Sequence, residues 1–256
     1  MHGGRMLLRI EDIDTTRCTP EFEQGIYRDL EWLGLEWEEP VRRQSEHLDV
    51  YRDALSRLRS MGLVYPAFMS RGEIRAHIAQ RGAAGQQWAR DPDGAPLYPP
   101  ADKRRSEAAR RQRISSGAPY SWRLDMERAI EQAGHLRWTE LAAEKTEDYG
   151  YADPLAWGDV VIARSDIPTS YHLSVVVDDA LQGITHVVRG RDLYEATSVQ
   201  RVLQACLGLS PPAYHHHRLI LGPDGRKLSK SEGSTGLRAL REAGRTPGDI
   251  RAMAGL

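Results

Sequence analysis

Two lysines, Lys227 and Lys230, are separated by Leu228 and Ser229 and follow an apolar run and a tight turn at 217–226. Two ammonium groups on one short loop can both reach the phosphates of a nucleotide, and serine hydroxyls add hydrogen-bond donors. The plain alternative is a solvated basic surface, because the chain holds 35 lysine and arginine residues. The segment alone is compatible with either interpretation.

Acidic residues end two other apolar runs. Glu11 opens the acidic turn 11–14 after the run 6–10, and Asp178 and Asp179 end a longer run. A carboxylate at such a position is commonly a solvated surface group. We expect Asp178 and Asp179 to be structural, with a ribose hydroxyl as the alternative partner.

Composition indicates a globular protein with an α/β core. The 256 residues are 40% hydrophobic and 28% charged, which is enough for one domain with a large insertion. No apolar stretch approaches the roughly 18 residues of a membrane span, and no signal peptide is evident, so we expect no membrane association and a cytoplasmic location. The net charge of −1 argues against a purely electrostatic nucleic-acid binder. Cys18 and Cys206 are solitary and are expected to be reduced thiols.

Hydrophobic patterning and capping residues predict alternating strands and helices. Thr19, Pro20 and Glu21 have the types expected at a helix start, and Gly34 suits its end. The run 171–179 is apolar enough for a strand buried on both faces. The expected strands are 6–10, 64–69, 157–163, 171–179 and 185–189, and the expected helices are 20–33, 45–62, 103–114 and 193–207.

The organisation indicates a doubly wound α/β domain with an insertion. Between about residues 70 and 150, glycine, proline, arginine and glutamine accumulate while apolar periodicity weakens. We interpret this part as an inserted α+β subdomain outside the main sheet. The expected segments are 1–69 and 151–222 for the core, 70–150 for the insertion, and 223–256 for the lysine loop with a C-terminal helical segment.

Three separated motifs resemble those of class I glutamyl-tRNA synthetases, in the same order and over nearly the whole chain. They are the segments 9–17 (RIEDIDTTR), 175–190 (VVVDDALQGITHVVRG) and 227–231 (KLSKS). The resemblance implies a Rossmann-like class I synthetase fold. Because the chain stops shortly after the lysine loop, it is most similar to the paralogous glutamyl-queuosine tRNA(Asp) synthetases, which lack an anticodon-binding domain. That likeness implies a ligase that activates L-glutamate with ATP and Mg²⁺ and esterifies it onto the queuosine base of tRNA(Asp).

The resemblance also implies roles for individual residues. Glu11 matches the carboxylate that binds the amino group of glutamate, and Tyr171 and Arg189 match the tyrosine and arginine of the glutamate pocket. The planar arginine fork suits a carboxylate, with a structural ion pair as the alternative. Lys230, with Lys227, is expected to act catalytically by neutralising charge on the ATP phosphates, and Ser229 to bind ATP with Lys230.

Two departures from the family matter. The first is the N-terminal βα unit with its His-x-Gly-His signature, which has no counterpart before the strand at 6–10, so we expect either an upstream start or a remnant of low stability or activity. The alternatives to the leading function are therefore the catalytic part of an ordinary glutamyl-tRNA synthetase, or a non-catalytic tRNA-binding remnant.

The second departure concerns zinc. Where many relatives carry Cys-x-Cys and Tyr-x-x-x-Cys, this chain has Ala67 and Met69, then Tyr98 and Asp102. This set lacks the thiolates of a tetrahedral site, so we expect no zinc. The three histidines 215–217 would alternate faces on a strand, which favours surface or adenine-side packing over a metal site.

Overall fold

The computed structural model describes residues 3–14, 18–141, 147–222 and 236–255. These residues form two compact units. Unit 1 comprises residues 1–47 and 218–256, and unit 2 comprises residues 48–217. The four-segment division expected from the sequence remains a prediction.

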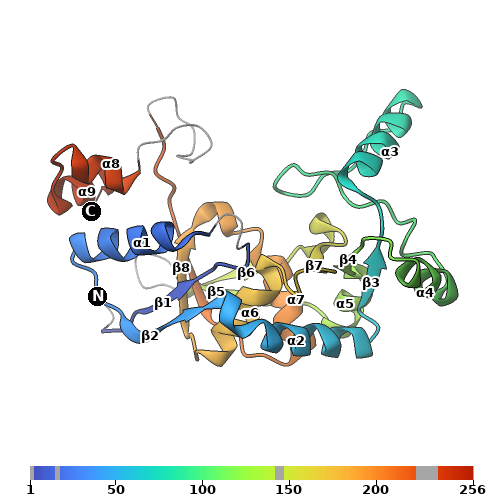
Figure 1. Ribbon diagram of the computed structural model, residues 1–256, viewed down its shortest axis with the longest axis horizontal. Helices are drawn as coiled ribbons and strands as arrows, with labels where there is room; N and C mark the ends of the chain where they lie inside the picture. Colours follow the sequence, from blue (N-terminus) through green and yellow to red (C-terminus); the bar gives the residue numbers. More distant parts are fainter. Residues whose placement is uncertain (1–2, 15–17, 142–146, 223–235, 256) are drawn as a thin grey trace. The chain divides into compact units, whose positions relative to one another are not determined.

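Unit 1 contains a pair of parallel strands with a helix between them in sequence (Figure 1). Its elements are β1 (Leu7–Ile10), α1 (Pro20–Trp32), β2 (Glu38–Arg43), the 3-10 helix η1 (Gln44–His47), α8 (Leu237–Glu242) and α9 (Pro247–Ala254). The hydroxyl of Thr19 accepts a hydrogen bond from the Phe22 N–H (3.4 Å) at the start of α1. Gly34 follows the helix with φ of 72°. The predicted strand 6–10 and helix 20–33 are therefore confirmed.

Unit 2 combines helices with a mixed sheet and an antiparallel sheet. Its helices are α2 (Leu48–Ser60), α3 (Arg71–Ala83), α4 (Glu107–Ser115), α5 (Met126–Ala133), α6 (Tyr171–Leu181) and α7 (Thr197–Leu207), with 3-10 turns η2 (Pro154–Trp157) and η3 (Arg191–Leu193). Its strands are β3 (Val64–Ala67), β4 (Ser121–Leu124), β5 (Arg137–Leu141), β6 (Glu147–Tyr151), β7 (Val161–Arg164), β8 (His186–Gly190) and β9 (Ala213–His217).

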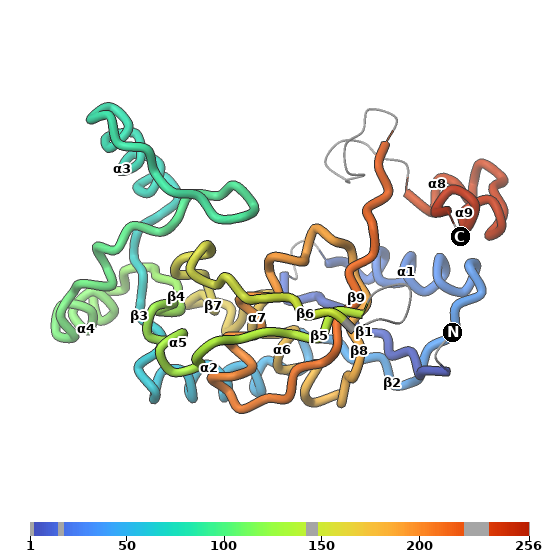
Figure 2. Tube along the Cα trace, turned by 180° about the vertical axis from the view of Figure 1, so that it is seen from behind, coloured from blue at the N-terminus to red at the C-terminus, as the bar shows by residue number. Residues whose placement is uncertain are grey.

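The two sheets of unit 2 differ in strand direction. One has the order β6-β5-β9-β8, in which β5 and β8 both run parallel to β9 (Figure 2). The other has the antiparallel order β3-β4-β7. In both views α3 stands away from the antiparallel sheet (Figures 1 and 2). The parallel pairs together with the helices confirm the expected α/β class.

The core of unit 2 lies among α2, α5, α6 and α7 and the inner strands. On α2 the apolar residues Tyr51, Leu55 and Leu58 recur at helical spacing and are buried. They pack with apolar side chains of α6 and α7, among them Leu173 and Leu203. Burial of this stripe, more than helix propensity, fixes α2 in place.

The prediction of a strand at 171–179 is wrong, because these residues belong to α6. Every residue from Leu173 to Asp178 is buried. A helix buried around most of its circumference shows no 3.6-residue periodicity, so its pattern cannot be told from that of a buried strand. The run Val175–Val177 favoured a strand through its β-branched side chains, and tertiary packing overrides that weak preference.

Other boundaries also shift. The strand predicted at 157–163 is shifted to 161–164 (β7), and the helix expected at 103–114 begins at Glu107. The expectation that residues 70–150 stay outside the main sheet is wrong for β5, which pairs with β9. Strand β9 itself, which carries the three histidines, was not predicted.

Candidate active site

Three predicted site residues, Lys227, Ser229 and Lys230, lie outside the described residues. Glu11 belongs to unit 1, whereas Tyr171 and Arg189 belong to unit 2. The contacts given below for Glu11 lie within unit 1, and those given for Tyr171 and Arg189 lie within unit 2.

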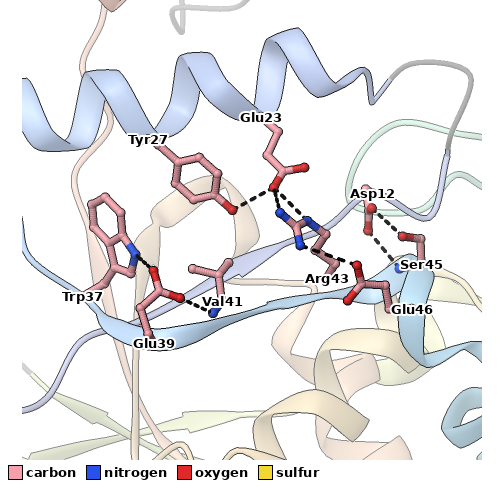
Figure 3. Close-up of polar contacts among 9 residues, drawn as sticks. All are labelled: Asp12, Glu23, Tyr27, Trp37, Glu39, Val41, Arg43, Ser45 and Glu46. Atoms are coloured by element: carbon pink, nitrogen blue, oxygen red, sulfur yellow. Dashed lines mark hydrogen bonds and ion pairs between the residues drawn. The ribbon is translucent and has the colours of Figure 1, made fainter.

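Glu11 directly follows β1 at a point where the backbone is anchored to β2 and η1. Its side chain is 41% exposed and lies 3.5 Å from the Arg9 guanidinium. The next residue, Asp12, accepts hydrogen bonds from both the N–H (2.9 Å) and the hydroxyl (2.6 Å) of Ser45. Figure 3 shows the Asp12–Ser45 bonds. Together with the pairing of β1 with β2, they hold the backbone on both sides of Glu11. The carboxylate of Glu11 is partly exposed, and the backbone that carries it is held in place. A cationic ligand can therefore reach it.

A second set of contacts joins α1 to β2 in the same unit. Glu23 accepts hydrogen bonds from the Arg43 guanidinium (2.5 and 2.8 Å) and from the Tyr27 hydroxyl (2.8 Å) (Figure 3). The bond from Arg43 is the main cause that lowers the pKa of Glu23. Arg43 also lies 3.5 Å from Glu46 in η1. These contacts hold α1 over the strand pair that carries Glu11.

Tyr171 is the first residue of α6 and is 37% exposed. Its neighbour His172 packs edge-on against Tyr171 (5.7 Å) and Trp157 (5.8 Å). Burial, and secondly the charge of Arg189, lower the pKa of His172 to about 4. The imidazole is therefore neutral at physiological pH.

Arg189 lies on β8 directly opposite His216 on β9. Its Nε donates to His216 Nε2 (3.0 Å), and its Nη2 donates to the Thr197 hydroxyl (2.6 Å). The Tyr214 ring lies 5.1 Å from the guanidinium carbon. Within the described part of the chain, no carboxylate forms an ion pair with Arg189, so the structural ion pair considered above is not found there. A half-buried guanidinium held by neutral groups retains its charge for an anionic ligand.

Sequence reasoning missed the polar network behind Arg189. Glu140 on β5 contacts His216 through Nδ1 (2.9 and 3.0 Å) and through the His216 N–H (2.9 Å). His216 is buried, contrary to the expectation of surface packing, whereas its neighbour His217 is exposed. Packing against adenine stays a prediction. The alternation of burial along β9 was foreseeable once a strand was assigned.

Asp178 is structural, as expected. It is fully buried on α6, and both carboxylate oxygens accept from the Tyr51 hydroxyl (2.8 and 2.9 Å). This bond ties α6 to α2 across the core.

The region compared with zinc sites holds a hydrogen-bond network. Asp102, fully buried, accepts from the Phe68 N–H (2.7 Å), the Arg105 guanidinium (2.6 Å) and the Tyr98 hydroxyl, which in turn accepts from the Met69 N–H (3.0 Å). Burial alone would raise the pKa of Asp102, but these bonds bring it below its ordinary value. Both carboxylate oxygens of Asp102 already accept hydrogen bonds, and the set contains no thiolate, so these residues do not fit a zinc ion.

Neither metal clusters nor membrane helices are found in the described ranges. Within residues 3–14, 18–141, 147–222 and 236–255, no group of three or more histidine, cysteine, aspartate or glutamate side chains is arranged to hold a metal ion. Over the same ranges, no helix has the length and apolar character needed to cross a membrane. Cys18 and Cys206 are free thiols, as predicted, and burial raises the pKa of Cys206 to about 11.

The sequence is similar to proteins of one family. The family described as tRNA synthetases class I (E and Q), catalytic domain, matches residues 1–252. A glutamyl-Q tRNA(Asp) synthetase of Rhodobacter capsulatus is 44% identical over 260 residues, covering 99% of this chain and 89% of the relative. A glutamate–tRNA ligase of Synechococcus sp. is 37% identical over 250 residues, covering 96% of this chain and 48% of the relative.

Solved structures show the same relationship. The crystal structure of a glutamate tRNA ligase from Elizabethkingia meningosepticum, in complex with its amino acid, superposes with a TM-score of 0.71 at 26% identity. The match covers 90% of this chain and 46% of that one, so the chain spans about half the length of the glutamate–tRNA ligases it matches. The chain therefore belongs to the class I tRNA synthetase family for glutamate and glutamine, and so to the aminoacyl-tRNA-synthetase-like ligases that use ATP as a substrate.

Proposed function

We propose that this protein activates L-glutamate with ATP and transfers it to the queuosine base of tRNA(Asp), in the cytoplasm. The choice of acceptor is supported by the 44% identity to the R. capsulatus glutamyl-Q tRNA(Asp) synthetase, compared with 37% to the Synechococcus glutamate–tRNA ligase. The choice of amino acid is supported by Arg189, a half-buried cation that donates hydrogen bonds to two neutral side chains, those of His216 and Thr197.

The chemistry requires positioning and positive charge more than a general base. An oxygen of the glutamate α-carboxylate attacks the α-phosphorus of ATP, the bond to the bridging oxygen breaks, and pyrophosphate leaves with the bonding electrons. A hydroxyl of queuosine then attacks the acyl carbon of the adenylate, the bond from that carbon to the phosphate oxygen breaks, and AMP leaves while the hydroxyl proton passes to the phosphate of AMP or to solvent. In this proposal Lys230 and Lys227 neutralise charge that grows on the phosphates, and Ser229 donates a hydrogen bond to them. Magnesium bound to the ATP phosphates would supply further positive charge.

The glutamate pocket is assigned by the same logic. The α-carboxylate is consumed in the first step, so a cation that holds a carboxylate throughout must bind the one on the side chain. Arg189 is suited to this role because its planar fork binds a carboxylate through two parallel hydrogen bonds. Tyr171 contributes to the same pocket, and Glu11 binds the α-ammonium group in this proposal. An arginine there would favour glutamate over glutamine, whose amide carries no charge.

A charging assay tests the acceptor. Labelled glutamate is supplied with ATP and one of three RNAs: tRNA(Asp) containing queuosine, tRNA(Asp) lacking it, and tRNA(Glu). We expect label only on the first. Label on tRNA(Glu) instead would identify the activity of an ordinary glutamyl-tRNA synthetase. Binding of tRNA without glutamate-dependent pyrophosphate exchange would identify a non-catalytic binding protein.

A lysine substitution tests the activation step. Lys230→Ala is expected to slow glutamate-dependent pyrophosphate exchange by about two orders of magnitude or more, while glutamate affinity changes little. Exchange near the rate of the unmodified protein would reject the role given to Lys230.

A further inference from the structure

The buried side of Arg189 is held by a chain of two residues, His216 and then Glu140. The Arg189 Nε–H can only donate, so His216 Nε2 must be the acceptor and carry no proton. The ring proton is therefore on Nδ1, from which it is donated to Glu140 (2.9 and 3.0 Å). The hydrogen-bond partners thus select one neutral tautomer of His216.

Glu140 is itself fixed by further donors. It accepts from the His216 backbone N–H (2.9 Å) and from the indole Nε1 of Trp138 (2.9 Å), which is 2% exposed. The His216 side chain is fully buried, and its ring stacks on Tyr214 at 5.9 Å. The network therefore has little freedom to rearrange.

These contacts leave one edge of Arg189 for a ligand. The Nε–H and one Nη2–H are engaged by His216 and Thr197, and the Tyr214 ring lies 5.1 Å from the guanidinium carbon. The remaining N–H groups, on Nη1 and Nη2, include the pair that can bind a carboxylate end-on. The orientation of that pair is set by the groups behind it.

We propose that His216 and Glu140 are positioning residues that orient Arg189 toward the side-chain carboxylate of glutamate. This inference rests on the proposed function for its ligand, whereas the orienting contacts stand on the structure of unit 2 alone. Neutral His216 accepts the Arg189 hydrogen bond, and a protonated ring would instead present a second cation and an N–H to the guanidinium. The arrangement is therefore sensitive to acid.

The elements that pack around His216 each bring charged or titratable groups close to its ring. These groups are Glu140 on β5, Arg189 on β8, Arg191 on η3, Tyr194 after η3, and Tyr214 on β9. Burial is the largest cause that lowers the pKa of His216, Glu140 opposes it, and Arg189 and Arg191 add to it. The ring consequently remains an acceptor at neutral pH.

The first test uses steady-state pyrophosphate exchange with matched variants. His216→Phe fills the ring volume without an acceptor, and we expect it to raise the KM for glutamate by about 10- to 100-fold, with the KM for ATP little changed. His216→Gln restores an amide oxygen as acceptor and should recover most of the loss. His215→Gln, on the adjacent position of β9, is the control and should leave the KM for glutamate unchanged. Equal KM values for glutamate in His216→Phe and the unmodified protein would overturn the proposal.

The second test is independent of activity. Nitrogen NMR of the labelled full chain reports whether His216 carries its proton on Nδ1 and whether the Arg189 Nε–H is protected from exchange. We expect both in the unmodified protein, and loss of Arg189 protection in His216→Phe but not in His215→Gln. An Nε2-protonated His216, or an unprotected Arg189 Nε–H, would overturn the positioning role even if glutamate is activated. If no exchange activity exists, the proposed function fails while this test still decides the orientation of Arg189.

Discussion

Gly150→Ala should strongly destabilise unit 2, because Gly150 lies opposite Trp138 in the β5–β6 pair. A Cβ at Gly150 would come within 2.0 Å of the indole Cε2 and 2.4 Å of Nε1. Ordinary contacts between carbon atoms are about 3.5–4.0 Å, so the ring would have to move by roughly 1.5 Å. Trp138 is buried and donates to Glu140, so that movement also breaks a hydrogen bond to a carboxylate.

The expected cost combines these two effects. Overpacking of a buried site costs about 1–3 kcal/mol, and the lost hydrogen bond to a carboxylate adds about 1.5–3 kcal/mol. Replacing glycine restricts the unfolded chain and returns about 0.4–1 kcal/mol. We therefore expect the free energy of unfolding to fall by about 2–5 kcal/mol.

Urea unfolding followed by far-ultraviolet circular dichroism measures this change. Gly82→Ala is the matched control in the same unit, because Gly82 lies in α3 with no atom within 4 Å of an added Cβ. The control should be neutral or slightly stabilising. A Gly150→Ala midpoint equal to that of the unmodified protein would refute the close packing of Trp138 on Gly150.

Three further predictions concern other parts of unit 2. Folding lowers the pKa of His172 from 6.5 to about 4, so between these pH values the unfolded chain binds a proton at His172 more readily than the folded chain does. The contribution of His172 to stability is therefore present above pH 6.5 and is lost as the pH falls to 4. The loss is at most about 3 kcal/mol. In a plot of the urea unfolding midpoint against pH, His172→Phe should flatten the curve between pH 6.5 and 4. An unchanged slope in that range would contradict the lowered pKa of His172. Tyr51→Phe removes the hydroxyl bonded to buried Asp178 and should lower the free energy of unfolding by about 1–3 kcal/mol, and an unaltered midpoint would count against that bond. Elemental analysis should find no stoichiometric zinc, since both oxygens of Asp102 already accept hydrogen bonds and the set lacks thiolates, and one equivalent of bound zinc would show that this conclusion is wrong.

Local signals in the sequence were sufficient for the elements that carry their own start and stop residues. Thr19 and Pro20 mark the beginning of α1, and Gly34 follows its end, so the prediction needed no tertiary information. The helix α2 was equally accessible, because its buried residues recur at helical spacing. Such features are determined by groups within a few positions of one another.

The helix α6 was predicted as a strand for the opposite reason. Its buried residues surround the helix axis, so the apolar pattern reports burial and not geometry. What decides the structure is the packing of Leu173 against the core and the bond from Tyr51 to Asp178, which joins positions 127 residues apart. No local window contains that information.

The site shows the same division between local and distant information. Arg189 was identified from a motif, whereas the partners that orient it required the parallel pairing of β5, β8 and β9. Glu140 and His216 are 76 residues apart, and Glu140 lies in the segment that appeared from composition to be an insertion. One glutamate among several in that segment and one histidine among three gave no signal of a shared function.

The order of groups behind Arg189 has an electrostatic consequence. A carboxylate in direct contact would attract the guanidinium by roughly 4 kcal/mol at 4 Å near a protein surface, and doubling the separation halves that energy. Such an acid would compete with the carboxylate of a substrate for the same cation. Glu140 instead contacts the far side of His216, so the imidazole transmits orientation while separating the two charges. An arginine that must bind a carboxylate reversibly is therefore better held by a neutral acceptor, such as His216, than by an acid.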